Sequence, residues 1–448
     1  MTASTIPFQT AGTVDIQELV IFTNTGKFLD IKDYLSELNI YEDIFSPTMH
    51  GDFLFVDSRN LIKELPIVGE EYLYVKLTTP STEQNIEKIF RIYSITDREL
   101  ANDRGTQLYI LNFCSLENVV NTFKPIFKTF KGQISTVVES IFNDYIQTKR
   151  VAVKKEAGYD FNEEVSKLQI ITATSNNVKF VSPGWTPFKC INWCASKSIP
   201  LEGKACNFLF FESNKAFVFG SIESIFKYNI DSGKDMSIGV YKYSTNQIKK
   251  NQNPIQKMFN VEEFQVIKTV DHLANYNNGY LANRLITLDV LNKKYEAHDY
   301  DAIESFNDYS HSEIQPRGFF ENDSMRTPLT DIRFQPIHPG MFPDIKDNVD
   351  EKMPEIYGNR KSNLLELNNF KLNLIVPGRT DVEVGRTLDF IFPDVSPKSE
   401  KDKNKFVGDK FYTGSYLITA IRHKVTLQSH HMIMEIVKDS MNDARENS

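Results

Sequence analysis

The pattern that decides the fold occurs twice, as IVGEEYLYVKL at 67–77 and as EVGRTLDFIF at 383–392. Each stretch places Val-Gly directly before a run in which apolar residues recur at alternate positions, and such alternation is typical of a half-buried β-strand. A glycine that opens the strand fits a turn requiring a positive φ angle. Both stretches are therefore predicted to be a turn followed by a strand.

Two more predicted strands follow each copy in the same order. The first copy continues with FRIYSITD (90–97) and QLYILNF (107–113), and the second with YLITAIRH (416–423) and HMIMEIV (431–437). The second copy also carries an insertion at 393–411, which a surface loop accommodates at little entropic cost. We interpret the repeat as two copies of one antiparallel barrel in tandem. The alternative is that two unrelated hairpins look alike.

The region between the two copies has helical character. Apolar residues recur at helical spacing over 116–123 and 134–145, and a proline just inside 186–198 favours a third helix. A strand hairpin is predicted at 207–221. A short helix is also expected at 58–65, within the first strand-rich region. These patterns indicate an α+β domain between the two barrels.

The fold class predicted from these patterns is α+β, mainly β, with two tandem antiparallel β-barrels, an α+β domain between them and an irregular arm. The predicted organisation is a first barrel at 1–115, an α+β domain at 116–228, a linker or surface loop at 229–260, a second barrel at 261–299 and 364–440, an irregular arm or insertion at 300–363, and a tail at 441–448.

Composition limits the classes of partner. The chain has 448 residues, enough for two to four domains. Its formal charge is −8, which argues against wrapping nucleic acid, because neutralising phosphates requires a basic surface. No secretory signal opens the sequence, and no apolar run approaches the roughly 18 residues of a membrane helix. Four cysteines are few for this length and fit synthesis in a reducing cytoplasm.

Metal sites and catalytic sets are weakly indicated. Cys190 and Cys194 share a helix face, and Cys206 follows, but three cysteines without a histidine partner make an incomplete zinc set. Burial in a packing helix explains them more simply. His430 and His431 are neighbours in a predicted strand, so they point to opposite faces. No metal ligand, cofactor-binding residue or catalytic residue is therefore assigned.

The remaining polar candidates have structural explanations. His298-Asp299 and His423 lie in predicted strands beside charged residues and are expected to be structural. Arg379 and Asp381 flank a turn in VPGRTDVEVG, the most ligand-like segment, where a local salt bridge is expected. No phosphate-binding glycine loop and no pair of acid and base carboxylates can be recognised. We expect the chain not to be an enzyme.

Taken together, the ordered segments resemble the baseplate central hub proteins of contractile-tailed phages of the T-even type. The segments that carry the resemblance are 38–73, 185–199, 207–225, 280–301, 372–392 and 414–425. The resemblance implies tail-tube-like barrels and a homotrimer that forms a pseudo-sixfold ring. Such a ring adapts a sixfold tail tube to a threefold central spike.

The resemblance also implies partners and a location. The partners are a central spike protein, the first tail-tube or tube-initiator ring, and further the tape measure protein and the baseplate wedge. Genomic DNA is expected only in transit, and no membrane insertion is expected. The location is the tail baseplate of the virion, after synthesis in the host cytoplasm. Two alternatives stay open: a tail-associated cell-wall hydrolase or peptidase, and a tube-initiator protein of a related injection machine.

Overall fold

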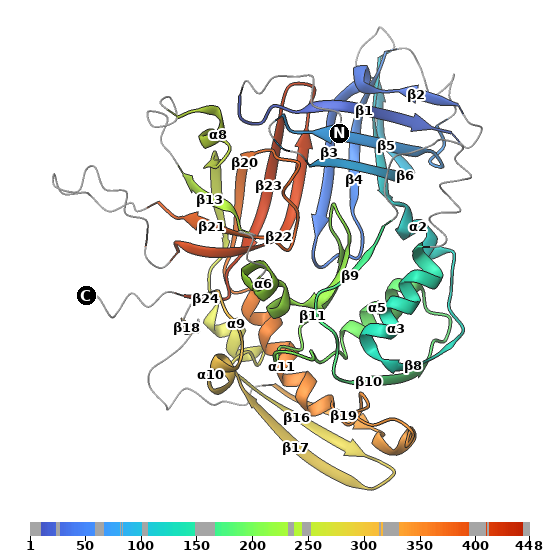
Figure 1. Cartoon of the computed structure of the whole chain (residues 1–448), viewed down its shortest axis with the longest axis vertical. Coiled ribbons are helices and arrows are strands. Elements are labelled where there is room, and N and C mark those ends of the chain that lie inside the picture. The colour runs from blue at the N-terminus through green and yellow to red at the C-terminus, as the bar shows by residue number, and fades with distance from the viewer. Residues whose placement is uncertain are drawn as a thin grey trace, which may run out of the picture.

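The fold is mainly β with interspersed helices, an α+β architecture (Figure 1). The computed structural model describes residues 10–23, 27–58, 67–80, 82, 84–100, 106–147, 166–231, 237–243, 252–312, 315–316, 331–393, 409 and 412–441. The helix predicted at 58–65 lies outside these residues apart from its first position, and the tail at 441–448 apart from Met441.

One sheet of 14 strands unites the two strand-rich regions within the described residues. The first region, here called the first module, supplies β1 (Asp15–Phe22), β2 (Phe28–Asp30), β3 (Leu35–Asp43), β4 (His50–Asp57), β5 (Tyr72–Thr78), β6 (Asn85–Leu100) and β7 (Gln107–Ser115). The second module supplies β13 (Ser237–Tyr243), β14 (Asn260–Val261), β15 (Glu263–Lys268), β20 (Lys371–Pro377), β21 (Thr387–Ile391), β22 (Gly414–Val425) and β23 (His430–Val437). The two modules lie side by side in the upper half of Figure 1.

Strand pairing repeats between the modules. In the first, β5, β6, β7, β4 and β3 are antiparallel neighbours in that order. In the second, β21, β22, β23, β20 and β15 form the same antiparallel series. The copies differ at the next strand, because β1 pairs with β5 in antiparallel fashion and β13 pairs with β21 in parallel fashion. The described sheet is open at its ends.

Local details support the same correspondence. Gly69 and Gly385 have φ angles of 93° and 79°, so both turns use the left-handed backbone region that favours glycine. A bulge follows Ile92 in β6 and Ile418 in β22. Each of these isoleucines donates its N–H, at 2.9 Å, to a carbonyl just after the preceding glycine. The predicted internal repeat is confirmed at the level of strand order.

Each module has its own apolar core. Inward side chains of β3 to β7 form one cluster, which includes Phe53, Leu73 and Phe113. Those of β20 to β23 form another, which includes Leu374 and Met434. In β4, β20 and β23 the alternation seen in the sequence therefore separates buried from outward residues. Strand β5 is buried on both faces, because Tyr72 and Tyr74 pack in a second cluster.

The middle region has the predicted α+β character and packs below the modules (Figure 1). Its elements are α2 (Leu116–Thr122), β8 (Thr129–Gln133), α3 (Ile134–Ile141), η2 (Phe142–Gln147), β9 (Leu168–Ile170), β10 (Asn177–Val181), α5 (Pro187–Ala195), β11 (Phe208–Glu212), β12 (Phe217–Ser221) and α6 (Ile222–Asp231). Pro187 occupies the first turn of α5 as predicted, where its missing N–H costs nothing. The hairpin β11–β12 projects towards the sheet.

Three predictions were wrong. The stretch 229–260, expected to be a linker or loop, contains β13, which joins the large sheet. The strand at 282–289, expected in the second barrel, is β16 (Ala282–Asp289) of a separate sheet with β17 (Lys294–Asp301) and β19 (Asp331–Ile337). The arm at 300–363, expected to be irregular, contains most of the 15-residue helix α11 (Met353–Leu367).

Helix α11 was missed for a physical reason. Between Ile356 and Leu367 its inward face is polar, because Asn359, Ser362, Asn363 and Glu366 are buried there, so the apolar periodicity is interrupted. Hydrogen bonds from other segments satisfy these side chains; for example, Cys206 N–H donates to Asn359 Oδ1 at 2.9 Å. Buried polar groups are tolerated where such partners exist, and the partners lie far away in sequence.

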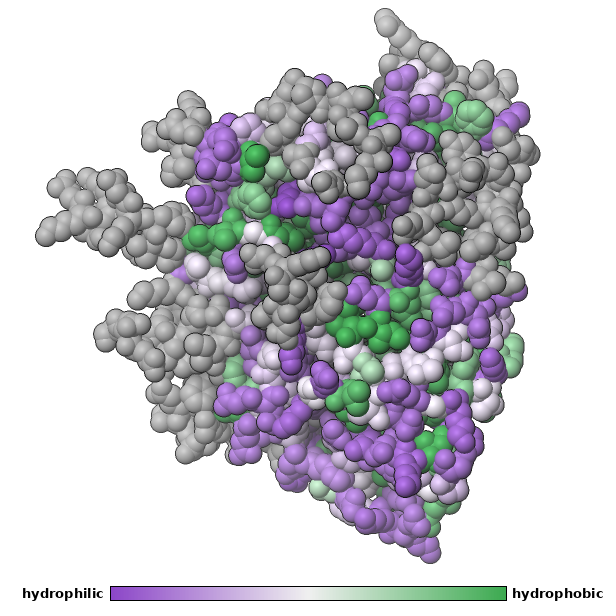
Figure 2. All heavy atoms as spheres, in the orientation of Figure 1, coloured by the Kyte–Doolittle hydropathy of each residue, from purple (hydrophilic) through white to green (hydrophobic). Residues whose placement is uncertain are grey.

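The remaining short elements are spread over the molecule (Figure 1). They are α8 (Pro254–Lys257), α9 (His272–Asn277), α10 (Ala302–Ser305), η3 (Phe306–Asp308), β18 (Gln315–Pro316), η5 (Pro339–Met341) and β24 (Ser440–Met441), with η1 (Lys32–Tyr34) in the first module. In the ranges that the structure describes, no helix is long and apolar enough to cross a bilayer. The lower end is mostly hydrophilic on the face shown in Figure 2, while hydrophobic residues form separate patches higher up.

Candidate functional site

The most informative region is the joint between the modules, where β22 of the second module pairs with β3 of the first. One edge of β22 is divided: residues 414–417 pair with β21, and residues 420–425 pair with β3. Ala420 lies opposite Asp43, and Val425 lies opposite Leu38. Val425 thereby enters the core of the first module. The joint is therefore a continuous antiparallel ladder between two repeated units.

Ion pairs reinforce the outward face of this joint. Arg422 Nη2 lies 3.0 Å from Glu37 Oε1, and Lys424 Nζ lies 2.9 Å from Glu37 Oε2. Arg422 also donates through Nε to Asn39 Oδ1 at 2.9 Å. These side chains are partly exposed, and pairs of this kind contribute at most about 1 kcal/mol each. Their main effect is to favour one register of the β22–β3 pairing, and they add little to the stability of the fold.

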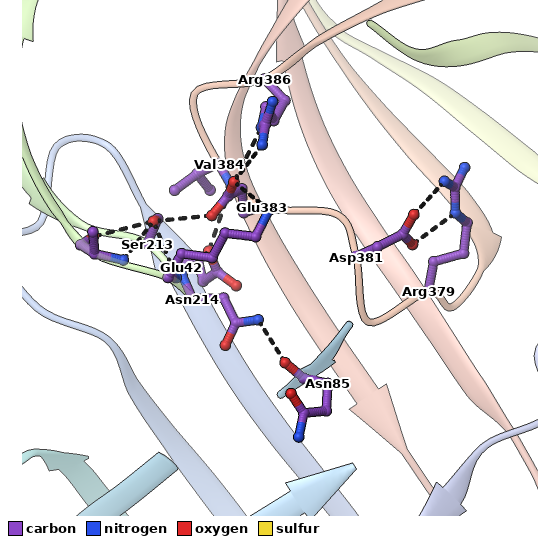
Figure 3. Close-up of polar contacts among 11 residues, drawn as sticks. Glu42, Asn85, Ser213, Asn214, Arg379, Asp381, Glu383, Val384 and Arg386 are labelled. Atoms are coloured by element: carbon purple, nitrogen blue, oxygen red, sulfur yellow. Dashed lines mark hydrogen bonds and ion pairs between the residues drawn. The ribbon is translucent and has the colours of Figure 1, made fainter. Parts of the chain in front are cut away.

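The buried face of the joint centres on Glu42 of β3. Its Oε2 accepts from the N–H groups of Asn214, at 3.2 Å, and Val384, at 3.4 Å, while Oε1 lies 3.3 Å from His423 Nε2. Asn214 belongs to the β11–β12 hairpin, Val384 to the second module and Glu42 to the first. One fully buried carboxylate thus contacts all three parts of the chain (Figure 3).

A second carboxylate, Glu383, holds the tip of the β11–β12 hairpin. Ser213 Oγ donates to Glu383 Oε2 at 3.1 Å (Figure 3). Lys215 Nζ lies 3.2 Å from Oε1 of the same carboxylate. Arg386 pairs with the same carboxylate at 2.9 Å. On the other side, Asn214 Nδ2 donates to the carbonyl of Asn85 in β6 at 3.2 Å. The hairpin tip is therefore bonded to both modules.

A buried ion pair anchors the same hairpin to the first module. Lys88 Nζ of β6 lies 2.8 Å from Glu212 Oε1 of β11, and both side chains are almost fully buried. Glu212 Oε2 also accepts from Met49 N–H at 2.9 Å and from Ser115 Oγ at 2.5 Å. Dense hydrogen bonding of this kind is what makes a buried charge pair tolerable. The middle domain and the first module are thus held as one body.

His430 extends the polar network into the second module. His430 Nε2 lies 3.1 Å from His423 Nδ1, and the ring occupies space that a side chain at position 378 would fill, where glycine stands. Burial, together with the nearby His423 and His431, holds the pKa of His430 well below the usual 6.5. The imidazole is therefore neutral in the folded state.

Acid is expected to destabilise the fold through His430. Below pH 6.5 the unfolded chain binds a proton that the folded chain does not, so each pH unit costs up to about 1.4 kcal/mol. We expect urea unfolding to show a smaller loss between pH 7 and pH 5.5 for His430→Gln than for the unmodified chain. The half-exposed neighbour gives the matched control, His431→Gln. Equal losses in both variants would contradict this assignment.

The cysteines considered as metal ligands lie apart from the joint. Cys190 and Cys194 are buried in the core of the middle domain, whereas Cys206 packs in a separate cluster with Ile199 and Ile356. Burial raises the pKa of the Cys206 thiol to about 12 and that of Cys114 to about 11. Throughout the described ranges, no three His, Cys, Asp or Glu side chains are grouped to hold a metal ion.

Arg379 and Asp381 form the expected salt bridge at 2.7 Å (Figure 3). Arg379 Nη1 additionally donates to the carbonyl of Ile238 at 3.1 Å, so the turn is tied to β13. His298 lies 3.2 Å from Thr287 Oγ1, and Asp299 pairs with Arg284. These polar groups have structural partners. Glu42 at the joint and the Lys88–Glu212 pair that anchors the hairpin were not singled out from the sequence.

Comparisons with known proteins place the fold. No family model matches the sequence, and no curated protein matches it. A tail protein from Neisseria meningitidis MC58 is similar at a TM-score of 0.51 and 11% identity, over 96% of each chain. The 43 kDa tail protein of prophage MuSo2 from Shewanella oneidensis gives 0.49 and 10%, over 95% of this chain and 99% of that one. A type VI secretion component of E. coli gives 0.41 and 8%, over 95% and 77%. Over nearly its whole length, the chain shares the fold of the Neisseria tail protein.

Proposed function

We propose that the chain is a structural, non-enzymatic baseplate hub subunit of a contractile phage tail. Three copies form a ring, and the ring adapts a sixfold tail tube to a threefold central spike. The observation that carries the proposal is the joint: two copies of one strand arrangement, hydrogen-bonded edge to edge in a single chain. The likeness to a tail protein along the whole chain supports the same assignment.

Symmetry explains why the repeat favours a trimer. Closed rings arise when identical head-to-tail contacts repeat around an axis. Three chains with two modules each present six similar units to a sixfold partner. In this ring each module completes a tail-tube-like barrel. The proposed domains are those expected from the sequence, except that β13 belongs to the second module, β16 and β17 belong to the lower sheet, and the former arm contains β19 and most of α11. The network around Glu42 keeps the two modules of one chain in fixed orientation.

The proposed partners follow from the two faces of such a ring. One face holds the central spike protein, and the other receives the first tail-tube or tube-initiator ring. The tape measure protein and the baseplate wedge are further partners, and genomic DNA passes only in transit. The protein would then reside in the tail baseplate of the virion.

Mass photometry tests the oligomeric part of the proposal. The chain has a mass of 51.6 kDa. We expect a species of three times this mass for the protein alone or, after addition of the spike protein, a complex that contains three copies of the chain together with the spike. A population that remains monomeric with the spike protein present would contradict the proposal.

A further inference from the structure

The two strands that form the internal joint each have a counterpart in the other module, and among the described strands the corresponding edge of each counterpart is open. The β6–β7 pair can be aligned on the β22–β23 pair at the bulge, which makes Ile92 the counterpart of Ile418. Counting along the partner strands then makes Gln107 the counterpart of His430. Leu100 pairs with Gln107 and Val425 pairs with His430, so Leu100 is the counterpart of Val425. The same procedure matches β15 with β3. Residues 263–266 (Glu-Phe-Gln-Val) then correspond to residues 37–40 (Glu-Leu-Asn-Ile), with like residue types at each position.

At the joint, one edge of β22 pairs with one edge of β3. The corresponding edges of their counterparts, β6 and β15, are not covered by any other described strand. In the second module, residues 420–425 of β22 are covered by β3. In the first module, β5 pairs with β6 only up to Arg91, and among the described strands none covers the same edge beyond that residue. Likewise β15 pairs only with β20 within the part of the chain that the structure describes.

Burial differs between the matched residues in a consistent direction. Val425, Thr419 and Val384 are buried at the joint, with exposed fractions of 0%, 0% and 3%. Their counterparts Leu100, Tyr93 and Val68 are apolar and exposed at 72%, 56% and 71%. On the other strand, Ile40 is fully buried, whereas Val266 is 39% exposed.

Exposed apolar residues beside an open strand edge indicate a surface that another strand covers. Unpaired N–H and C=O groups on such an edge are a template for a further strand. The β6 edge lies in the first module and the β15 edge in the second, so the two edges are different. They are complementary because their counterparts, β22 and β3, pair with each other at the joint. A contact between different surfaces of identical chains is heterologous, and repetition of it closes a ring or extends a filament.

We propose that β6 of one copy pairs antiparallel with β15 of the next copy, in the register of the internal joint. Leu100 then lies opposite Phe264, Glu99 opposite Gln265 and Thr96 opposite Lys268. This pairing rests on the proposed ring and supplies its contact between chains. Leu100 enters the apolar core of the neighbouring second module, as Val425 enters the core of the first module.

The charged residues at the proposed interface match those at the internal joint only in part. Glu263 takes the place of Glu37, but Glu99 stands where Lys424 supplies a cation at the joint. A second bulge in β6 brings Arg98 into the same stretch. Arg98 donates to Gln107 Oε1 of its own chain at 2.8 Å. The match in apolar residues and in strand pairing, rather than in charge, is therefore what supports the register.

A cysteine pair tests the register directly. Cβ atoms of opposed residues lie about 4.5–5.5 Å apart, close to the separation that a disulfide spans. In the full-length chain carrying Glu99→Cys and Gln265→Cys, we expect mild oxidation to give a covalent trimer on a non-reducing gel. The four native cysteines are buried, so they give little background.

Two matched variants make the result specific. Asn39→Cys with Lys424→Cys stands at the internal joint and should close within one chain, leaving the monomer band. Glu99→Cys with Leu201→Cys places the second thiol on the exposed surface of the middle domain and should give no covalent trimer. If this displaced pair cross-links as well as the proposed pair, the register is wrong.

A second measurement separates failure of the register from failure of the ring. Leu100→Asp buries a charge at the interface, and we expect about a ten-fold loss of the trimeric fraction in mass photometry. The thermal midpoint of the monomer should stay unchanged, since Leu100 is exposed in the single chain. A full trimer in this variant would overturn the strand pairing while leaving the proposed function intact. Absence of trimer in the unmodified chain, with the spike protein present, would overturn both.

Discussion

Replacing Glu212 by alanine is expected to lower the free energy of unfolding by about 3–5 kcal/mol, because it removes the carboxylate that opposes a buried ammonium. Lys88 lies 2.8 Å from this carboxylate, and neither side chain is appreciably exposed. The substitution also removes the acceptor of Met49 N–H and Ser115 Oγ. Unmade hydrogen bonds of buried groups add to the cost. Urea unfolding followed by circular dichroism measures the change.

The double variant Lys88→Met with Glu212→Leu is the matched control. Exchanging both charges for apolar side chains of similar volume is often neutral, so most of the lost stability should return. This outcome would assign the cost to the unpaired charge rather than to lost packing. A loss below about 1 kcal/mol in Glu212→Ala would contradict the buried pair as an anchor of the hairpin.

Replacing Gly51 by alanine is expected to cost about 3 kcal/mol through overpacking of β4. A Cβ at this position would overlap the backbone oxygen of Asn39 and the ring of Phe113. Neither neighbour can move easily, since Asn39 belongs to the β3 ladder and Phe113 is fully buried in the core. Strand β3 would have to shift, and it is the strand that forms the joint.

Gly340→Ala provides the comparison for this substitution. A Cβ at position 340 meets nothing within 4 Å, so we expect a change within about 0.5 kcal/mol. Differential scanning calorimetry on both variants gives the two values. Similar midpoints for Gly51→Ala and Gly340→Ala would show that β3 and β4 are less tightly packed than described.

The parts of the fold that the sequence predicts are those with local signals. Alternation in 72–78 and 416–425, the glycines at 69 and 385 and the order of the strands all belong to short windows. They are enough to identify two related modules. The helix start at Pro187 is likewise a local signal, and it was predicted correctly.

The parts that could not be predicted depend on partners distant in sequence. Glu42 bonds to the N–H of Val384, 342 positions away, and Lys88 pairs with Glu212, 124 positions away. In the sequence, Lys88 is only a charge that interrupts the apolar run of β6. A charged residue at an inward strand position is the signal that could have identified these groups, since a buried charge requires a partner. The pairing of β22 with β3 has no local signature at all.

In the proposed assembly, two equivalent modules per chain close into a ring of three chains. A cryo-EM reconstruction of the purified protein tests this claim most directly. We expect a ring of three copies in which six similar strand modules alternate around the axis, with β6 of each copy beside β15 of the next. A ring in which the first and second modules are not related by approximate sixfold symmetry, or a particle without threefold symmetry, would contradict it.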